Sequence, residues 1–170
     1  LYYADLESPE LIGRRAGERV VARLNPRQVD TASNVIVVYD PRVARGFAST
    51  IAGAINGASV ARKSSFLWDK MGEQILSSKI TITDDPQIIR GPSSRPFVGE
   101  GVAGKKLTMI EKGVIKEWFL STAIGREIGF ETNGRGVRGG TSVGAASTNL
   151  VLEPGELSPE ELIAEVGNGF

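Results

Sequence analysis

A glycine-rich segment, residues 133–144, is the part of the sequence whose composition most suggests ligand binding. Five of its twelve residues are glycine, and it includes two arginines. Glycines leave backbone N–H groups accessible, and guanidinium groups bind carboxylates and peptide carbonyls. We expect a peptide substrate or a partner protein to contact this segment. A solvated loop without a ligand is the alternative. The candidate contact residues are Asn133, Gly134, Arg135, Arg138 and Gly139.

The spacing Gly134-x-Gly136-x-x-Gly139 matches the glycine pattern of dinucleotide-binding proteins. In those proteins the glycines lie between a strand and a helix, whose N-terminus receives the pyrophosphate. Here no clear strand precedes the glycines, and residues 140–144 do not have the composition of a helix start. We therefore expect no nucleotide cofactor.

Asp84 and Asp85 are adjacent carboxylates at the end of a predicted strand. Two carboxylates at the end of a strand can hold a hard cation or act as an acid and base. Two aspartates before Pro86 are also typical of a turn, which is the interpretation we favour. Glu100 lies between two glycines, which is typical of a loop.

The chain contains no histidine and no cysteine. Disulfides, thiolate nucleophiles, histidine bases and zinc sites built from Cys or His are therefore excluded within it. A serine nucleophile at Ser64 or Ser65 would need Lys63 or Lys70 as its base. Capping of a helix is the more ordinary role of these serines. We predict no catalytic residue, no metal ligand and no cofactor in this chain.

Length and charge limit the remaining possibilities. The 170 residues include 20 Lys and Arg and 20 Asp and Glu, so no net positive charge attracts nucleic acid. No apolar run is long enough to cross a membrane, and the first residues lack the pattern of a signal peptide. We expect a single region, residues 1–170, that is part of a longer cytoplasmic chain and binds neither nucleic acid directly nor membrane.

Several helices are predicted from one repeated signal, a capping residue followed by proline and then apolar residues at helical spacing. The signal occurs at Ser8-Pro9, Asp40-Pro41 and Ser158-Pro159. The first helix should extend to about Leu24, and the second should be mostly buried. Shorter helices are expected within residues 65–75 and 121–128.

Strands are predicted at three places. Residues 35–39 form a β-branched run typical of a buried strand, and residues 79–83 alternate as a half-exposed strand does. Residues 107–110 and 114–120 should form a hairpin through Gly113. Because strands and helices do not alternate strictly, we expect an α+β fold with a mainly antiparallel sheet and several packed helices.

Short segments of the sequence, taken in order from about Asn25 onward, resemble the TldD/PmbA family, known as modulators of DNA gyrase. Each segment is short, and their common order makes the match specific. They are AGAING (52–57), RKSSFL (62–67), DKMG (69–72), TITDDP (81–86), Phe97, GEGV (99–102), GVI (113–115), TNG (132–134), STNL (147–150) and EPG (153–155).

The resemblance implies a zinc-dependent peptidase made of two kinds of subunit, which acts on peptides and unstructured substrates. In the TldD-like subunit a helix carries His-Glu-x-x-x-His, where the histidines bind zinc and the glutamate is the general base. That segment falls here on Ala52 to Gly57, without either histidine and with Gly53 in place of the glutamate. The sequence therefore resembles the PmbA (TldE) type, the subunit without its own zinc site.

The resemblance thus implies a partner subunit of a TldD-type metallopeptidase complex, which contributes to peptide binding in proteolysis. The expected partners are a TldD-like subunit and a peptide or unfolded protein substrate, in a homo- or hetero-oligomer. Zinc is expected only in the TldD-like partner. The alternative is a regulatory binding protein that modulates DNA gyrase and has no proteolytic role.

Overall fold

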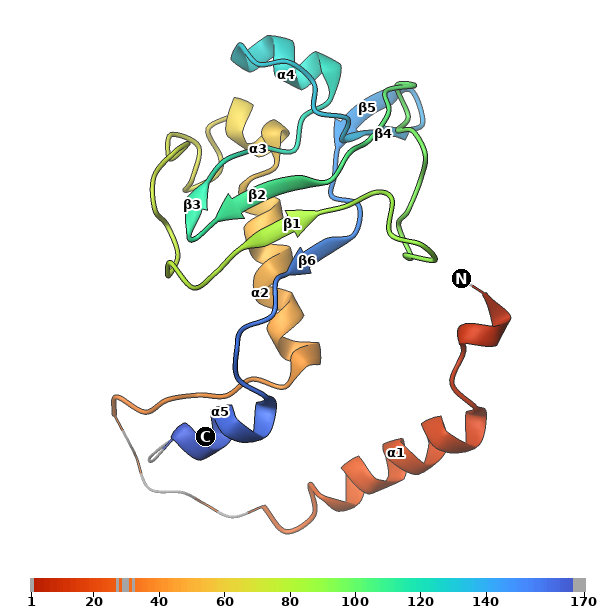
Figure 1. Ribbon diagram of the computed structural model, residues 1–170, viewed down its shortest axis with the longest axis vertical. Helices are drawn as coiled ribbons and strands as arrows, with labels where there is room; N and C mark the ends of the chain where they lie inside the picture. Colours follow the sequence, from red (N-terminus) through yellow and green to blue (C-terminus); the bar gives the residue numbers. More distant parts are fainter. Residues whose placement is uncertain (1, 27, 29–30, 32, 167–170) are drawn as a thin grey trace.

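A four-stranded antiparallel sheet is the centre of the fold in the computed structural model, which describes residues 2–26, 28, 31 and 33–166 (Figure 1). The strand order is β3-β2-β1-β6. Together with the helices, this sheet confirms the predicted α+β class. The strands are β1 (Ile82–Asp84), β2 (Leu107–Glu111), β3 (Val114–Ile115) and β6 (Leu150–Leu152).

The hairpin between β2 and β3 forms where it was predicted. Gly113 has a φ of +83°, and a Cβ atom there would lie 2.2 Å from the carbonyl oxygen of Leu76. Only glycine fits this turn, for both reasons. The second strand is shorter than expected because the chain leaves the sheet after Ile115. Phe119 instead forms an isolated parallel bridge with Asn56.

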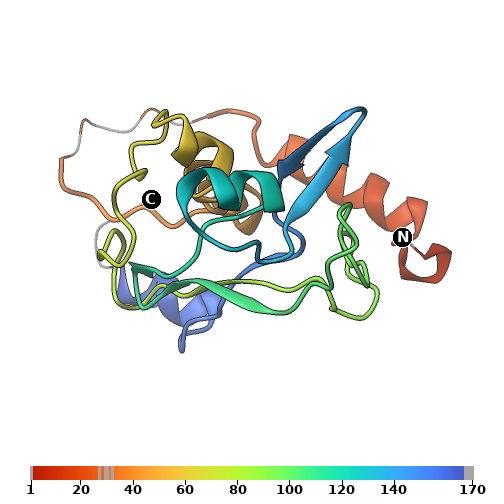
Figure 2. The same ribbon diagram turned by 90° about the horizontal axis from the view of Figure 1, so that it is seen from above.

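Helices cover one face of the sheet, as the view from above shows (Figure 2). They are α2 (Pro41–Ala54), α3 (Gly57–Ala61) and α4 (Thr122–Ile128). The core lies between them and the sheet. Its fully buried side chains include Ile55 at the end of α2, Met109 and Ile115 from the sheet, and Phe119.

All three proline-marked helices form where predicted. Ser8 caps α1 (Pro9–Val21), Asp40 caps α2, and Ser158 caps α5 (Pro159–Glu165) in a reciprocal capping box with Glu161. Ser121 likewise caps α4. A short 3-10 turn, η1 (Tyr3–Asp5), precedes α1. Helix α1 lies apart from the sheet and has no buried residue (Figure 1).

Three element predictions are wrong. Residues 35–39 contain only an isolated bridge at Ile36 and no strand, because neither edge strand of the sheet pairs with them. Helix α2 is not mostly buried: Ala54 is its one buried residue, while Val43 and Phe47 are 57% and 55% exposed. Residues 65–75 form turns instead of a helix.

Helices long and apolar enough to cross a membrane are absent from the described residues.

Candidate functional site

The glycine-rich segment is an ordered β-hairpin, made of β4 (Gly136–Gly139) and β5 (Ser142–Ala145). Gly140 has a φ of +61°, the left-handed value typical of a tight hairpin turn. Figure 2 shows the hairpin standing out beside α4. The glycines of the dinucleotide pattern therefore lead into a strand and not into a helix N-terminus. The segment is therefore a hairpin with a regular ladder and not an irregular loop.

The register of this hairpin shows which backbone groups point outward. Ala146 N–H donates to Arg135 C=O, so the Ala146 N–H and the Arg135 C=O point across the hairpin, while the Arg135 N–H donates to Leu120 C=O. The pairing alternates along the ladder, so Val143, opposite Arg138, turns its N–H and C=O away from β4. No hydrogen bond within the described part of the chain uses these two groups of Val143. The outer edge of β5 is thus open at Val143.

Hydrogen bonds on both outer sides fasten the hairpin to the rest of the domain. Gly99 N–H donates to Gly136 C=O at 3.2 Å, on the outer side of β4. On the outer side of β5, the Asn56 side-chain amide donates to Ala145 C=O at 2.6 Å. Asn56 is also the N-cap of α3. The open strand edge therefore begins next to the junction of α2 and α3, the segment where the zinc-binding pattern falls by resemblance.

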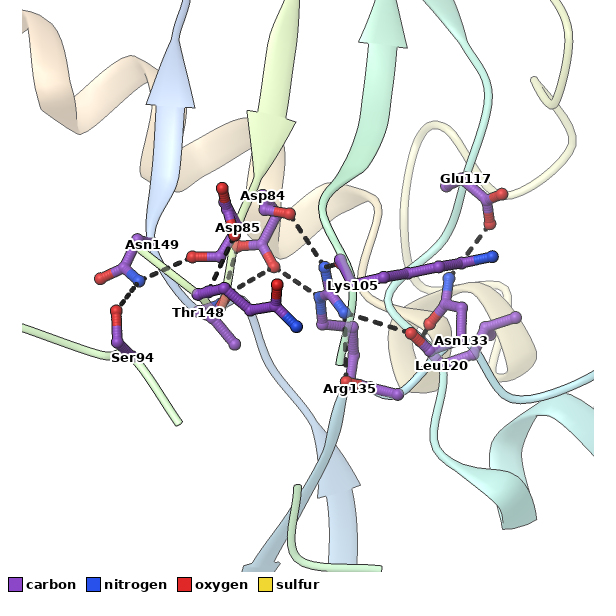
Figure 3. Close-up of polar contacts among 12 residues, drawn as sticks. Asp84, Asp85, Ser94, Lys105, Glu117, Leu120, Asn133, Arg135, Thr148 and Asn149 are labelled. Atoms are coloured by element: carbon purple, nitrogen blue, oxygen red, sulfur yellow. Dashed lines mark hydrogen bonds and ion pairs between the residues drawn. The ribbon is translucent and has the colours of Figure 1, made fainter. Parts of the chain in front are cut away.

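Arg135 is completely buried, which corrects the expectation that it offers its guanidinium group to a ligand. Its Nε donates to the Asp84 carboxylate (Figure 3). One terminal nitrogen donates to the carbonyl oxygens of Asp84 and Lys105 at 2.9 and 2.8 Å. The other donates to the carbonyls of Asn133 and Gly134 at 3.1 and 3.2 Å. All its donor nitrogens are engaged, so Arg135 ties strands together.

Asp84 is likewise saturated by protein groups. Besides Arg135, its carboxylate accepts hydrogen bonds from the Thr148 N–H and hydroxyl, at 2.7 and 2.8 Å. Asp85 accepts from the N–H of Gln87 at 2.8 Å, as an aspartate in a turn does. Neither carboxylate is arranged for a cation. Groups of three or more His, Cys, Asp or Glu that could hold a metal ion are absent from the described residues.

A second cluster of hydrogen bonds holds the segments that flank the Arg135–Asp84 ion pair. Asn149 donates to Asp85 C=O and to the Ser94 hydroxyl, at 2.7 and 2.8 Å (Figure 3). Next along the sheet, Thr83 donates to Glu153 at 2.8 Å. This hydrogen bond lowers the pKa of the Glu153 carboxyl below its usual value, and nearby Lys106 acts in the same direction. These contacts hold the segments around residues 85, 94 and 153 against the sheet.

Asn133 and Gly134 also belong to the framework in this structure. The Asn133 side chain accepts from Leu120 N–H at 3.0 Å (Figure 3). It also donates to Trp118 C=O at 2.7 Å. Gly134 is buried with a φ of +71°. Of the five predicted contact residues, only Arg138 and Gly139 are exposed, both near the tip of the hairpin.

The segment 52–57 bends from the end of α2 into the start of α3. Gly53 is exposed, and a Cβ atom there would meet no atom within 4 Å. At Gly57 a Cβ atom would lie 2.6 Å from Phe119 C=O, 2.7 Å from Leu120 and 2.8 Å from Ile124. Position 57 thus has no room for a side chain of any kind, an imidazole included.

The serine candidates have structural contacts. Ser65 is buried, and its hydroxyl donates to Ala54 C=O at 2.6 Å and accepts from Leu67 N–H at 3.0 Å. The Ser64 hydroxyl donates to Ser59 C=O at 3.2 Å. Lys63 lies with its Nζ 4.7 Å from the centre of the Trp68 ring. These positions give no hydroxyl–amine pair for catalysis.

Sequence reasoning missed Asn56, Thr148 and the open edge at Val143. Asn56 before a glycine is an N-cap signal that the pattern search could have used. Thr148 had no such signal, because its partner Asp84 is 64 positions away. The direction of the Val143 backbone groups depends on the register of the hairpin, which follows from tertiary contacts.

Comparison with known proteins gives one consistent result. Residues 32–170 match the family model described as the PmbA/TldA metallopeptidase C-terminal domain. Metalloprotease PmbA of Escherichia coli O157:H7 is 34% identical over 167 residues, which are 98% of this chain and 35% of that protein. A PmbA homologue of Haemophilus influenzae is 36% identical over 129 residues, 76% of this chain and 28% of that protein.

Solved structures agree. A Bacteroides thetaiotaomicron structure that carries the name modulator of DNA gyrase has a TM-score of 0.84 and 31% identity, over 99% of this chain and 36% of that one. TldE from Thermococcus kodakarensis has a TM-score of 0.68 and 28% identity, over 94% of this chain and 37% of that one. The chain spans about a third of the length of the relatives it matches. It belongs to the PmbA/TldD family of metallopeptidase-related proteins, and residues 32–170 correspond to the C-terminal domain of that family.

Proposed function

We propose that this chain is the peptide-binding part of a PmbA (TldE)-type subunit, which acts with a TldD-type metallopeptidase partner and supplies no zinc ligand of its own. The observation that carries the proposal is the open edge of β5 at Val143, beside the junction of α2 and α3. An extended peptide adds to such an edge through main-chain hydrogen bonds.

The absence of zinc ligands in this chain is supported by composition and by space. The sequence has no His and no Cys, and carboxylates alone hold zinc weakly. In addition, the backbone carbonyl of Phe119 lies where a side chain at Gly57 would begin. The zinc, the general base and the activated water would therefore come from the partner subunit.

The chemistry available at the hairpin fits a substrate without a fixed sequence. Val143 offers one N–H and one C=O to a peptide backbone, whatever side chains that peptide has. Gly144 and Gly139 are exposed and leave the faces of the hairpin clear of side chains. Arg138 is exposed near the tip, where its guanidinium group can bind a carboxylate of the peptide.

A proline substitution at the open edge tests this proposal. Val143→Pro removes the outward N–H and leaves the β4–β5 hydrogen bonds in place, because the Val143 N–H is not part of that ladder. Val143→Ala is the matched control, since it shortens the side chain and keeps the N–H. The proline variant loses one hydrogen bond to the peptide, and its ring keeps the peptide backbone away from the edge of β5. We therefore expect about tenfold weaker peptide binding for this variant alone.

The readouts are peptide affinity and peptidase activity after mixing with a TldD-like subunit. Both should fall for Val143→Pro and stay near the parent values for Val143→Ala, while circular dichroism and thermal melting show that both variants fold. Equal affinity and activity in the two variants would contradict the proposal. Gyrase supercoiling measured with the same proteins separates the regulatory alternative, which predicts an effect on supercoiling without proteolysis.

A further inference from the structure

An aromatic cavity lies at the C-terminal ends of α3 and α4, whereas the hairpin contacts Asn56 at the N-terminal end of α3. It has a volume of about 380 Å³. Its apolar lining includes Trp68, Met71, Trp118 and Phe130. Trp118 is buried, whereas Trp68 and Phe130 are 40% and 46% exposed, so the two aromatic rings at the mouth are accessible.

The charges around this cavity are unbalanced. Lys63, Asp69 and Glu127 line it, which leaves one excess negative charge. Asp69 is 4.0 Å from Lys70, but Lys70 lies closer to Glu73, at 3.2 Å. Glu127 takes part in no ion pair within the described part of the chain. The last residues of both α3 and α4 also line the cavity, and helix C-termini favour positive charge.

A positive group already occupies one aromatic face. The Nζ of Lys63 lies 4.7 Å from the centre of the Trp68 ring, within the range of a cation–π interaction. This contact shows that the indole face is positioned to accept a cation. The second exposed ring, Phe130, has no such resident partner among the described cation–π pairs.

The backbone at Lys63 is unusual for the residue type. Lys63 has a φ of +55°, directly after the C-cap Arg62 of α3. Its N–H donates to Val60 C=O, and the next N–H donates to Ser59 C=O, which together form a Schellman ending. Glycine is the usual residue at this position because it adopts a left-handed φ without strain. A lysine here accepts that strain and extends over Trp68.

We propose that this cavity binds an arginine side chain of another polypeptide, which stacks on Trp68, displaces Lys63 and forms ion pairs with Glu127 and Asp69. Arginine fits these observations better than lysine, because its planar guanidinium group stacks on aromatic rings and pairs with carboxylates through a fork of donors. Lys63 then acts as a resident competitor for the same ring. This site is separate from the β5 edge and does not depend on the proposed peptidase role.

Binding of a short arginine peptide to the full chain tests the proposal. The probe is acetyl-Gly-Ala-Arg-Ala-Gly-amide, and its matched control replaces arginine with citrulline, the uncharged analogue of the same shape. Affinity is measured by calorimetry and by tryptophan fluorescence, since Trp68 is the more exposed of the two tryptophans. We expect saturable binding of the arginine peptide at least tenfold tighter than that of the citrulline peptide.

Four variants test the role of each side chain in binding the arginine peptide. Lys63→Gly should bind the arginine peptide several-fold tighter, because the cation that competes for the Trp68 ring is removed. Glu127→Gln and Asp69→Asn should each weaken binding several-fold, and Trp68→Leu should abolish it. Thermal unfolding midpoints equal to that of the parent protein would show that Glu127→Gln and Asp69→Asn fold. Equal binding of the two peptides, or weaker binding by Lys63→Gly, would overturn the proposal.

Discussion

At the scale of single residues, two arginines three positions apart have different roles. Arg135 and Arg138 belong to the same short segment, and from the sequence alone both were predicted to contact a ligand. In the structure Arg135 is buried against the Asp84 carboxylate, while Arg138 is exposed on the next strand. A buried arginine with all its donors engaged is part of the framework and is unavailable to a ligand.

This difference predicts opposite effects on stability. Arg135→Ala leaves Asp84 buried without its counter-charge, so we expect the free energy of unfolding to fall by about 3–5 kcal/mol. Arg138→Ala is the exposed control and should change it by less than about 0.5 kcal/mol. Urea unfolding followed by circular dichroism measures both values. Equal unfolding midpoints for the two variants would show that the buried ion pair does not hold the strands.

At the scale of elements, the junction of α2 and α3 depends on two glycines with different surroundings. Gly57 is enclosed by the Phe119 backbone and by the side chains of Leu120 and Ile124. Gly53 lies in the last turn of α2 and faces open space. The same residue type is therefore required at one position and only tolerated at the other.

Paired alanine substitutions should separate these two glycines. Gly57→Ala forces the Cβ atom against a backbone carbonyl, so we expect a loss of about 1–3 kcal/mol in the free energy of unfolding. Gly53→Ala improves helix propensity without a clash and should raise that free energy by about 0.5–1 kcal/mol. Thermal and urea unfolding measure both. Stabilisation by Gly57→Ala would mean that position 57 has room for a side chain.

Elements also show where local patterns fail. The three serine- or aspartate-proline starts form helices as predicted, because capping involves residues a few positions apart. The β-branched run at residues 35–39 does not form a strand, because a strand needs a partner and neither edge of the sheet supplies one. Strand propensity mostly reflects packing against neighbours, which a single segment cannot reveal.

At the scale of the whole molecule, the proposal is that the TldD-like partner holds the zinc ion and this chain does not. We expect the chain after dialysis against a chelator and then against zinc to contain only background metal, because it has no His and no Cys. Zinc and peptidase activity should appear together only when a TldD-like subunit is added. Metal analysis by mass spectrometry of each protein alone and of the mixture measures this. One zinc retained per chain in the isolated protein would contradict the proposal.

The sequence by itself determined features that depend on composition or on near neighbours. These are the exclusion of Cys and His chemistry, the α+β class, the capped helices and the β2–β3 hairpin, in which Gly113 marks the turn. Short segments in a shared order were enough to indicate the PmbA/TldD family. Composition and local geometry are properties of the chain before it folds, so reasoning on the sequence can reach them.

Only the tertiary structure decided which polar residues are buried and which backbone groups are free. The partnership of Arg135 with Asp84 joins positions 51 apart, and the fastening of the hairpin by Asn56 joins positions 89 apart. The same holds for the open edge at Val143 and for the cavity beside Trp68. Such pairings arise when separate elements pack, because burial and strand register are set by contacts between distant segments and not by the residues of any one segment.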